Sequence, residues 1–321
     1  MEFTLKNIIR IGSPYIIALA GLSFFPGTAS GQDKEEIGVE DSRLVITPLF
    51  EYPVAPEEMT DLQAKTGWLM DHFWDSMDFS TKQSVDQNAL NDAFQVYGAA
   101  AIHAPKSKVL KSVNSLVKSI KGNPVLLLQF AKGAEEAFYG PRAVGWSDEI
   151  YMPFVEAVVA DKSISDSRKI RYKAILDNMK RNAIGVKFPK LRLTLRNGRH
   201  QDFTPENEYT LIEVGNPDCD DCKFAKMKLD MASDIREMIA DKKIGMVFLV
   251  ADAVPEEEAE ILSHFQSYPQ DWLTGISYGA DDLLDLRATP SFYVLGKKGE
   301  ILAKNLDVDA AVETIRSLVK L

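Results

Sequence analysis

Residues 213–222 read EVGNPDCDDC and hold the only two cysteines of the 321-residue chain, Cys219 and Cys222. An apolar run over residues 209–214 predicts a strand that enters this stretch, and residues 223–242 predict a helix that leaves it. A cysteine at the start of a helix lies close to unpaired backbone N–H groups and to the positive end of the helix dipole, and both favour its thiolate. The stretch therefore predicts a reactive dithiol.

A structural disulfide is the alternative role for this pair of cysteines. A bond between two residues so close in the sequence closes almost no loop, so it removes little entropy from the unfolded chain. The chain also places both of its cysteines in this one motif. We therefore favour redox chemistry over a structural crosslink.

The composition is that of a globular protein long enough for two domains. Hydrophobic residues make up 45% of the chain and charged residues 26%, which is ample for a packed core. The net charge of -10 argues against nucleic acid or an anionic membrane as the main partner. After the N-terminal segment, no stretch has the roughly 18 consecutive apolar residues that a membrane span needs.

The N-terminal segment has the pattern of an export signal. Lys6 and Arg10 give a positive start, residues 11–25 are apolar, and small residues precede an expected cleavage site at Gly31. An uncleaved membrane anchor is the alternative, but the apolar stretch is short for one. We therefore expect a cleaved signal peptide over residues 1–30 and a periplasmic or otherwise exported protein, which meets the membrane only through that signal.

A helical domain is expected after the signal. Residues 31–56 are polar, acidic and contain three prolines, which predicts an extended arm. Residues 57–183 have apolar residues at three- and four-residue spacing and few strand signals, which predicts an all-α domain of six helices. Gly122 followed by Pro124 predicts the end of one helix and the start of the next.

Two sets of residues in this chain have both a functional and a structural interpretation. Aromatic residues of the helical domain could line a peptide groove, but their positions on apolar helical faces favour the core; they are Trp68, Phe73, Trp74, Tyr139, Trp146, Tyr151 and Phe154. Four histidines have no partners at metal-ligand spacing, so we expect no metal site; they are His72, His103, His200 and His264.

From residue 187 the apolar pattern changes to that of strands. An Asn-Gly pair at Asn197 and Gly198 predicts a tight turn between two short strands, residues 191–195 and 199–203. The later elements are expected to be strand 209–214, helix 223–242, strand 244–250, helix 255–266, short helix 280–286, strand 291–295, strand 300–304 and helix 307–319. The two strands that flank the first of these helices should be parallel and joined by a right-handed crossover.

Three features of the C-terminal region occur together in one known superfamily. They are a Cys-x-x-Cys at the start of a helix, a proline just before a late strand, and an acid six residues before the first cysteine. The residues concerned are Cys219, Cys222, Thr289, Pro290 and Glu213. Residues 187–321 therefore resemble the thioredoxin superfamily, especially its exported thiol-disulfide oxidoreductase branch.

Further motifs resemble a group of exported bacterial thioredoxin-like proteins that join a helical N-terminal domain of unknown function to this fold. The motifs are residues 216–219 (NPDC), residues 271–272 (DW), residues 288–293 (ATPSFY) and the stretch 139–176. The resemblance implies an N-terminal all-α helical domain, residues 57–183, and a C-terminal α/β thioredoxin-like fold. It implies no chemistry for the helical domain.

The resemblance also implies an exported thiol-disulfide oxidoreductase that acts as a reductant of protein disulfides. Cys219 would attack the substrate disulfide, and Cys222 would resolve the mixed disulfide. Glu213, if buried, would have a raised pKa and would accept the proton of Cys222, whereas its alternative is an exposed carboxylate at a strand edge. Thr289 and Pro290 would hold the substrate backbone through a short β-bridge. The partners are a protein disulfide substrate and an upstream electron donor, with no metal, organic cofactor or nucleic acid.

The acidic residues around the first cysteine depart from the pattern of the superfamily. Asp218 replaces the usual tryptophan, and Asp220 and Asp221 lie between the cysteines. Like charge disfavours the first thiolate and so favours the disulfide. This predicts a potential near the reducing end of the range from about -120 to about -270 mV, although Lys223 and Lys226 offset part of the effect.

Two other functions are consistent with parts of the sequence. The first is a non-catalytic binding protein, in which the helical domain binds a partner and the thioredoxin-like fold is a scaffold with an idle dithiol. Reversible cycling of the cysteines would separate an enzyme from this alternative. The second is a peroxidase of the peroxiredoxin class, which needs a threonine three residues before its reactive cysteine. Asn216 lies at that position, so this class is not favoured.

Overall fold

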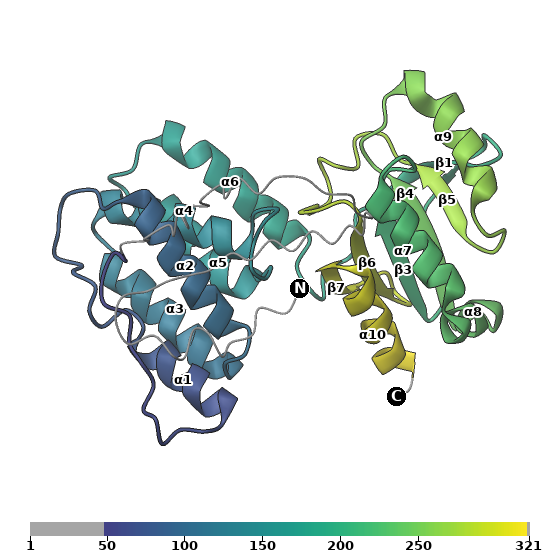
Figure 1. Ribbon diagram of the computed structural model, residues 1–321. Helices are drawn as coiled ribbons and strands as arrows, with labels where there is room; N and C mark the ends of the chain where they lie inside the picture. Colours follow the sequence, from purple (N-terminus) through teal and green to yellow (C-terminus); the bar gives the residue numbers. More distant parts are fainter. Residues whose placement is uncertain (1–47, 320–321) are drawn as a thin grey trace, which may run out of the picture. The chain divides into compact units, whose positions relative to one another are not determined.

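The computed structural model describes residues 48–319. The expected signal peptide, residues 1–30, and most of the expected arm lie outside the described residues. Helices between residues 62 and 181 precede a mixed sheet that has its own helices, which confirms the two-domain layout expected from the sequence (Figure 1). None of the helices within the described residues is long and apolar enough to cross a membrane.

The contacts between residues divide the chain into two compact units. The first ends at Gly133 and the second begins at Ala134, so the division falls inside the helix Pro124–Phe138 (α4). The expected domain boundary between residues 183 and 187 lies within the second unit. The last two helices of the helical region therefore form one compact unit with the sheet.

Four helices account for most of the first unit. They are Leu62–His72 (α1), Gln87–Ala101 (α2), Lys106–Ile120 (α3) and α4. The Asp86 carboxylate accepts a hydrogen bond from the Ala89 N–H at 2.9 Å and caps α2, as its position in the sequence predicts. Gly122 has a φ of 87°, a left-handed conformation that ends α3 before Pro124 begins α4.

The core of the first unit is largely aromatic. The Trp74 ring lies 5.1 Å from the Phe94 ring and 5.5 Å from the Tyr97 ring, measured between centroids. Such tilted contacts between buried rings stabilise the packing beyond the burial of their area. Of the aromatic residues considered for a groove, four are buried, as expected for core residues: Phe73, Trp74, Tyr151 and Phe154. Three are half-buried: Trp68, Tyr139 and Trp146.

The second unit is built on a seven-stranded mixed sheet. Its strands are Arg192–Leu195 (β1), His200–Asp202 (β2), Tyr209–Val214 (β3), Ile244–Val250 (β4), Leu273–Ile276 (β5), Ser291–Gly296 (β6) and Ile301–Leu306 (β7). They lie in the order β2-β1-β5-β4-β3-β6-β7. β3, β4 and β5 are parallel, whereas β6 is antiparallel to β3. The carboxyl ends of β3, β4 and β5 and the start of β6 therefore share one edge of the sheet.

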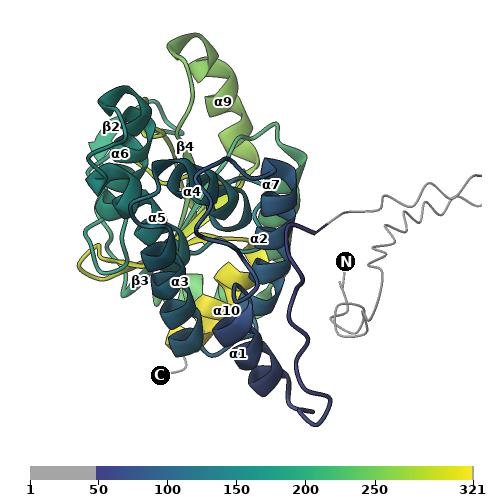
Figure 2. The ribbon, with the colours of Figure 1, turned by 90° about the vertical axis from the view of Figure 1, so that its left-hand side faces the viewer.

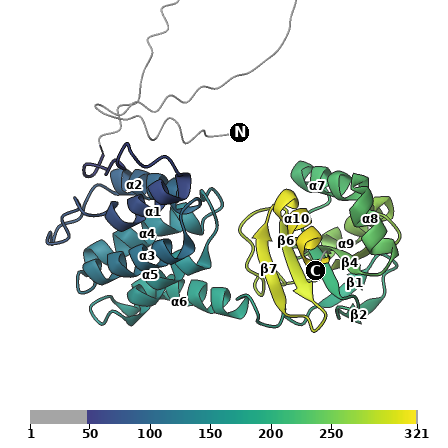
Figure 3. The ribbon, with the colours of Figure 1, turned by 90° about the horizontal axis from the view of Figure 1, so that it is seen from below.

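Helices cover one face of this sheet. The helices of the second unit are Asp148–Ala160 (α5), Asp166–Arg181 (α6), Asp220–Met231 (α7), Ser233–Ala240 (α8), Glu258–His264 (α9) and Val308–Val319 (α10). Apolar residues of α7, α8, α9 and α10 form one core with the strands, and α7 lies beside α10 (Figure 3). On the opposite face, Phe188, Ala280 and Leu284 pack against the strands.

Three predicted elements differ from the structure. The helix expected over residues 223–242 is two helices, α7 and α8, because Ala232 has an extended conformation between them. The helix expected over residues 280–286 is a series of turns. β5 lies in a stretch predicted to be irregular. β5 is only four residues long and pairs with β4 on one side and β1 on the other. Hydrogen bonds to these neighbours, and not the strand propensity of its own residues, therefore hold it in the sheet.

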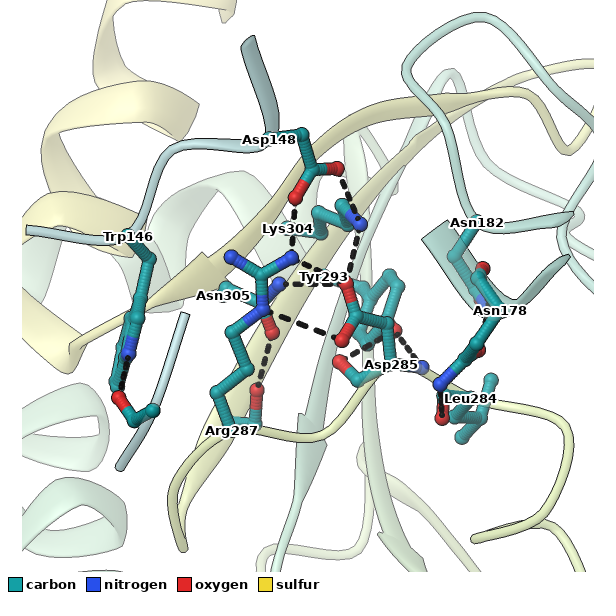
Figure 4. Close-up of polar contacts among 12 residues, drawn as sticks. Trp146, Asp148, Asn178, Asn182, Leu284, Asp285, Arg287, Tyr293, Lys304 and Asn305 are labelled. Atoms are coloured by element: carbon teal, nitrogen blue, oxygen red, sulfur yellow. Dashed lines mark hydrogen bonds and ion pairs between the residues drawn. The ribbon is translucent and has the colours of Figure 1, made fainter. Parts of the chain in front are cut away.

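A buried charge cluster ties α5 to the end of the sheet (Figure 4). It consists of Asp148, Asp285, Arg287 and Lys304. Arg287 Nη2 donates to Asp285 Oδ2 at 2.7 Å and also contacts Asp148, while Lys304 Nζ lies 2.8 Å from Asp148 Oδ2. Burial favours the neutral acid, but Arg287 and Lys304 outweigh it, so the pKa of Asp285 is lowered. Two carboxylates and two cations thus balance each other, with Asp285, Arg287 and Lys304 almost wholly buried and Asp148 at the edge of the cluster.

The end of α6 adds hydrogen bonds to the same loop. The Asn182 side chain donates to the Leu283 carbonyl at 3.0 Å, and the Asn178 side chain donates to the Leu284 carbonyl at 3.4 Å (Figure 4). The Arg287 guanidinium also lies 4.2 Å from the centre of the Tyr139 ring. Residues of the helical region therefore fix the loop that leads directly into Thr289 and Pro290.

Candidate functional site

The two cysteines lie at the start of α7. Cys219 is the N-cap residue, and its Sγ accepts a hydrogen bond from the Cys222 N–H at 3.4 Å. Cys219 is partly exposed, Cys222 is fully buried, and both thiols are free. The Cys222 N–H, in the first turn of α7, therefore points at the Cys219 sulfur.

The turn before α7 brings the second sulfur close to the sheet. The Asn216 side chain accepts a hydrogen bond from the Asp218 N–H at 2.9 Å, which shapes the turn. Gly215 packs against the second cysteine so closely that an added Cβ would lie 2.7 Å from Cys222 Sγ. Only glycine therefore lets the chain pass beside the buried thiol.

Cys222 needs a proton acceptor before it can react. Burial raises the pKa of this thiol, and the hydrogen bond that the thiol donates to Cys219 and the charge of Glu213 raise it further. A thiol with a raised pKa is a poor nucleophile at neutral pH, since the thiolate is the reactive form. The nearest acidic influence on this thiol is the charge of Glu213.

Glu213 is a buried carboxyl group without a hydrogen-bond partner among the described residues. It lies on β3 on the face that packs against α7, as does Leu211 two residues before it. Burial raises the pKa of Glu213 to about 8, and the positive charge of Lys226 offsets part of that rise. The alternative of an exposed carboxylate at a strand edge is wrong, because β4 and β6 flank β3 on both sides.

Lys226 and Tyr268 complete the surroundings of this acid. Lys226 Nζ lies 4.2 Å from the centre of the Tyr268 ring and donates to the Ser267 carbonyl at 2.7 Å. Burial lowers the pKa of Lys226, and burial together with the charge of Glu213 raises the pKa of Tyr268. No local pattern marks Tyr268 in the sequence, because it is a single aromatic residue in a stretch predicted to be irregular.

The Thr289–Pro290 pair lies beside the exposed thiol. Its peptide bond is cis, and the Cys219 thiol lies 3.9 Å from the Thr289 carbonyl oxygen, to which it donates. Thr289 is exposed. Ser291, the next residue in β6, pairs with Val214 at the end of β3. The fold therefore brings all five residues expected for the site, from two distant parts of the sequence, to one edge of the sheet.

Known proteins resemble this chain in both of its parts. Residues 28–182 match a family model described as a domain of unknown function (DUF5106). A thioredoxin-like protein from Bacteroides caccae has a crystal structure that covers 84% of this chain and 98% of its own, with 24% sequence identity and a TM-score of 0.70. The C-terminal mixed sheet and its helices have a thioredoxin-like fold. The expected combination of a helical domain of unknown function with this fold is thus confirmed.

Other solved structures match a smaller part of the chain. The thioredoxin domain of a thiol-disulfide oxidoreductase from Bacteroides vulgatus covers 43% of this chain and 98% of its own, with 19% identity and a TM-score of 0.35. A domain of a possible thiol-disulfide isomerase from Cytophaga hutchinsonii covers 43% and 94%, with 21% identity and a TM-score of 0.36. No curated protein matches this chain.

A group of metal-ligating side chains lies next to the dithiol of the thioredoxin-like domain. His264 Nε2 lies 3.5 Å from Asp218 Oδ1, and ligand atoms of Asp218, Glu260 and His264 lie within 4.8 Å of one another. The sequence analysis found no partner for His264. Glu260 is one turn before it on α9, but Asp218 is 46 positions away in sequence and reaches it only through the fold.

Proposed function

We propose that this protein is an exported thiol-disulfide oxidoreductase that reduces disulfides in other proteins. The observation that carries the proposal is the pairing of a partly exposed thiol at a helix start with a buried second thiol and a buried, unpartnered carboxyl group. On a thioredoxin-like domain, this set of groups supports dithiol chemistry. Export is proposed from the signal pattern in residues 1–30.

The chemistry proceeds by two exchanges. The Cys219 thiolate attacks one sulfur of the substrate disulfide, so a mixed disulfide forms and the other substrate sulfur leaves as a thiolate. The Cys222 thiolate then attacks Cys219 Sγ, which breaks the mixed disulfide and releases the second substrate thiolate. The substrate gains two electrons and, after proton uptake, two thiols. The protein ends with a Cys219–Cys222 disulfide, which a dithiol electron donor must reduce.

Glu213 is proposed to take the proton of Cys222 in the second exchange. Its pKa of about 8 lies close to neutral pH, so a fraction of the group is ionised there and can accept a proton. Thr289 is proposed to hold the substrate, because its exposed backbone next to Cys219 can pair with an extended segment.

Single cysteine variants test this function. The reduced protein is mixed with an oxidised disulfide peptide, quenched with acid, alkylated and weighed by mass spectrometry. We expect the unchanged protein to form the Cys219–Cys222 disulfide and Cys222→Ser to accumulate the mixed disulfide. Cys219→Ser should show no reaction above that of the double Cys219→Ser/Cys222→Ser control. Full reduction of the peptide by the double variant would contradict the proposal.

A titration in glutathione buffers tests the direction of electron flow. We expect the Cys219–Cys222 disulfide to have a midpoint below about -220 mV, in the range of reductants. A midpoint near -120 mV would identify an oxidant. If the cysteines do not cycle at all, the non-catalytic binding protein with a thioredoxin-like scaffold becomes the better account.

A further inference from the structure

The edge of the sheet that carries the dithiol is formed by two segments besides the loop of Thr289. Residues 215–226 follow β3, and residues 251–264 follow β4. Because β3 and β4 are parallel and Val214 pairs with Leu249, both segments begin at the same edge. In Figures 1 and 2, α9 projects from this end of the sheet.

Exposed carboxylates dominate these two segments. We call them the acidic rim: Asp218, Asp220, Asp221, Asp252, Glu256, Glu257 and Glu260. Glu258 is half-buried and hydrogen-bonded to the exposed Tyr278 hydroxyl. The rim adjoins the reactive thiol in the sequence, because Asp218 directly precedes Cys219, and Asp218 in turn groups with Glu260 and His264.

Few cations balance the rim. The two segments contain only Lys223 and Lys226 as lysines and no arginine. Lys223 lies 3.4 Å from Asp220, and Lys226 is turned toward the Ser267 carbonyl and the Tyr268 ring. The surface around the dithiol therefore has a strong excess of negative charge, with most carboxylates free to face a partner.

Apolar side chains lie within this charged surface. Phe224 is 54% exposed and follows Cys222 by two residues, and Val254 is 47% exposed in the loop after β4. Exposed apolar groups beside a reactive site, surrounded by charge, are typical of a protein-binding surface with an apolar centre and a polar periphery.

We infer that the acidic rim selects cationic partners: the disulfide that Cys219 reduces lies in a protein segment flanked by lysine or arginine, with an apolar residue to contact Phe224. This inference rests on the proposed function. Charges at the edge of an interface act mainly by steering the encounter, and such steering raises association rates by about tenfold or more in low salt. Salt weakens it, because the Debye length falls from about 30 Å at 0.01 M to about 3 Å at 1 M.

Two matched peptides test the inference on the full chain. Both contain the same disulfide loop, and they differ only in two flanking residues, which are lysines in one and glutamates in the other. The rate at which each oxidises the reduced protein is measured by quenching and alkylation at about 20 mM and about 500 mM NaCl. A chelator is present because Asp218, Glu260 and His264 could otherwise bind a divalent cation. We expect the lysine peptide to react about tenfold faster in low salt and the difference to shrink toward one in high salt.

Two triple variants test whether the charge of the rim itself or the net charge of the protein selects the peptide. Each variant removes three negative charges, one set from the rim and the other from elsewhere on the surface. Asp252→Asn/Glu257→Gln/Glu260→Gln removes three rim charges without touching the Cys-x-x-Cys. Glu206→Gln/Glu208→Gln/Asp241→Asn removes three exposed charges just before β3 and β4, at the opposite edge of the sheet. The rim variant should lose most of the preference for the lysine peptide, and the control should keep it. If the rim variant does not fold, the salt dependence of the unchanged protein decides.

The outcomes distinguish this inference from the proposed function. Equal rates for the two peptides in low salt, or a faster glutamate peptide, would overturn the cationic partner and leave the oxidoreductase intact. An equal loss of preference in the rim variant and the control would show that net charge, and not this surface, selects the partner. If neither peptide nor the neutral reagent 2,2'-dipyridyl disulfide oxidises the dithiol, the proposed function itself fails.

Discussion

At the scale of single residues, Glu213 is the group with the highest cost of burial in the site. An ionised carboxylate without a hydrogen-bond partner is strongly disfavoured in the interior, so the neutral acid predominates below pH 8. A glutamine or leucine at this position would avoid that cost. Under the proposed function, proton transfer and not stability accounts for an acid at this position.

Glu213→Gln should make the protein more stable at high pH than the unchanged chain. Below about pH 4.5 the acid is neutral in both the folded and the unfolded chain. Between pH 4.5 and about 8 only the unfolded chain ionises, so the free energy of unfolding falls as pH rises, by about 1.4 kcal/mol per pH unit and a few kcal/mol in all. Urea unfolding of both proteins at pH 5, 6.5 and 8 measures the difference. The exposed Glu208→Gln is the control, and it should show no such trend with pH.

The same substitution should slow the second thiol exchange while leaving the first one intact. In a single-turnover experiment, mixed disulfide should accumulate in Glu213→Gln, because the Cys222 proton has lost its acceptor. The unchanged protein should show a resolution rate that rises with pH up to about 8. A Gln variant with the same rate and the same pH profile would contradict the assigned role.

At the scale of elements, the buried charge cluster joins α5 to the loop between β5 and β6. Asp148 supplies one of its two carboxylates from the first turn of α5, and Arg287 and Lys304 are at most 6% exposed in their side chains. Such clusters contribute little net stability when complete, since desolvation offsets their attraction. Removal of one member is different, because it leaves a buried charge without its partner.

Asp148→Asn should therefore destabilise the protein by about 3 kcal/mol, as the loss of one partner from a buried ion pair does. The substitution leaves two cations with a single carboxylate, Asp285. Urea unfolding at neutral pH measures the loss. Asp177→Asn, which removes an exposed carboxylate from α6, is the matched control and should change the free energy of unfolding by less than about 0.5 kcal/mol. Equal effects of the two substitutions would show that the cluster is not a unit.

At the scale of the whole molecule, the domain boundary predicted from the sequence, between residues 183 and 187, differs from the boundary between the compact units, which falls after Gly133. The sheet begins after residue 187, but Asp148, Asn178 and Asn182 all contact the loop before β6. That loop carries Thr289 and Pro290. The last two helices of the helical region thus support the geometry of the proposed site, although they hold none of its reactive groups.

A fragment that starts at α4 should be more stable than one that starts at the sheet. In residues 187–321, Arg287 and Lys304 lack Asp148, and two loop carbonyls lack their donors. We expect the sheet of residues 187–321 to unfold with a free energy lower by about 3 kcal/mol or more than in residues 124–321. Urea titrations followed by circular dichroism and by the fluorescence of the buried Trp272 measure both. Equal stability of the two fragments would contradict a structural role for α5 and α6.

The sequence by itself determined the elements whose signals are local. The apolar run of β3, the turn at Asn216, the cysteines and the start of α7 are adjacent in the chain, so periodicity and turn residues suffice to predict them. The hairpin at Asn197 and Gly198 and the helix boundary at Gly122 are local for the same reason. The superfamily motifs then predicted the five candidate site residues, which the fold places at one edge of the sheet.

Only the tertiary structure decided the features that depend on distant residues. β5 forms because β1 and β4 supply its hydrogen-bond partners. Its own four residues include a glycine, so their strand propensity is too weak to predict a strand from the sequence. Asp148 forms an ion pair with Arg287, which is 139 positions later in the sequence, and His264 lies within ion-pair distance of Asp218, which is 46 positions earlier. Burial of Glu213, and with it a pKa of about 8, follows from strands on both sides of β3 and a helix above it. Such contacts are set by the packing of whole elements, which no local pattern encodes.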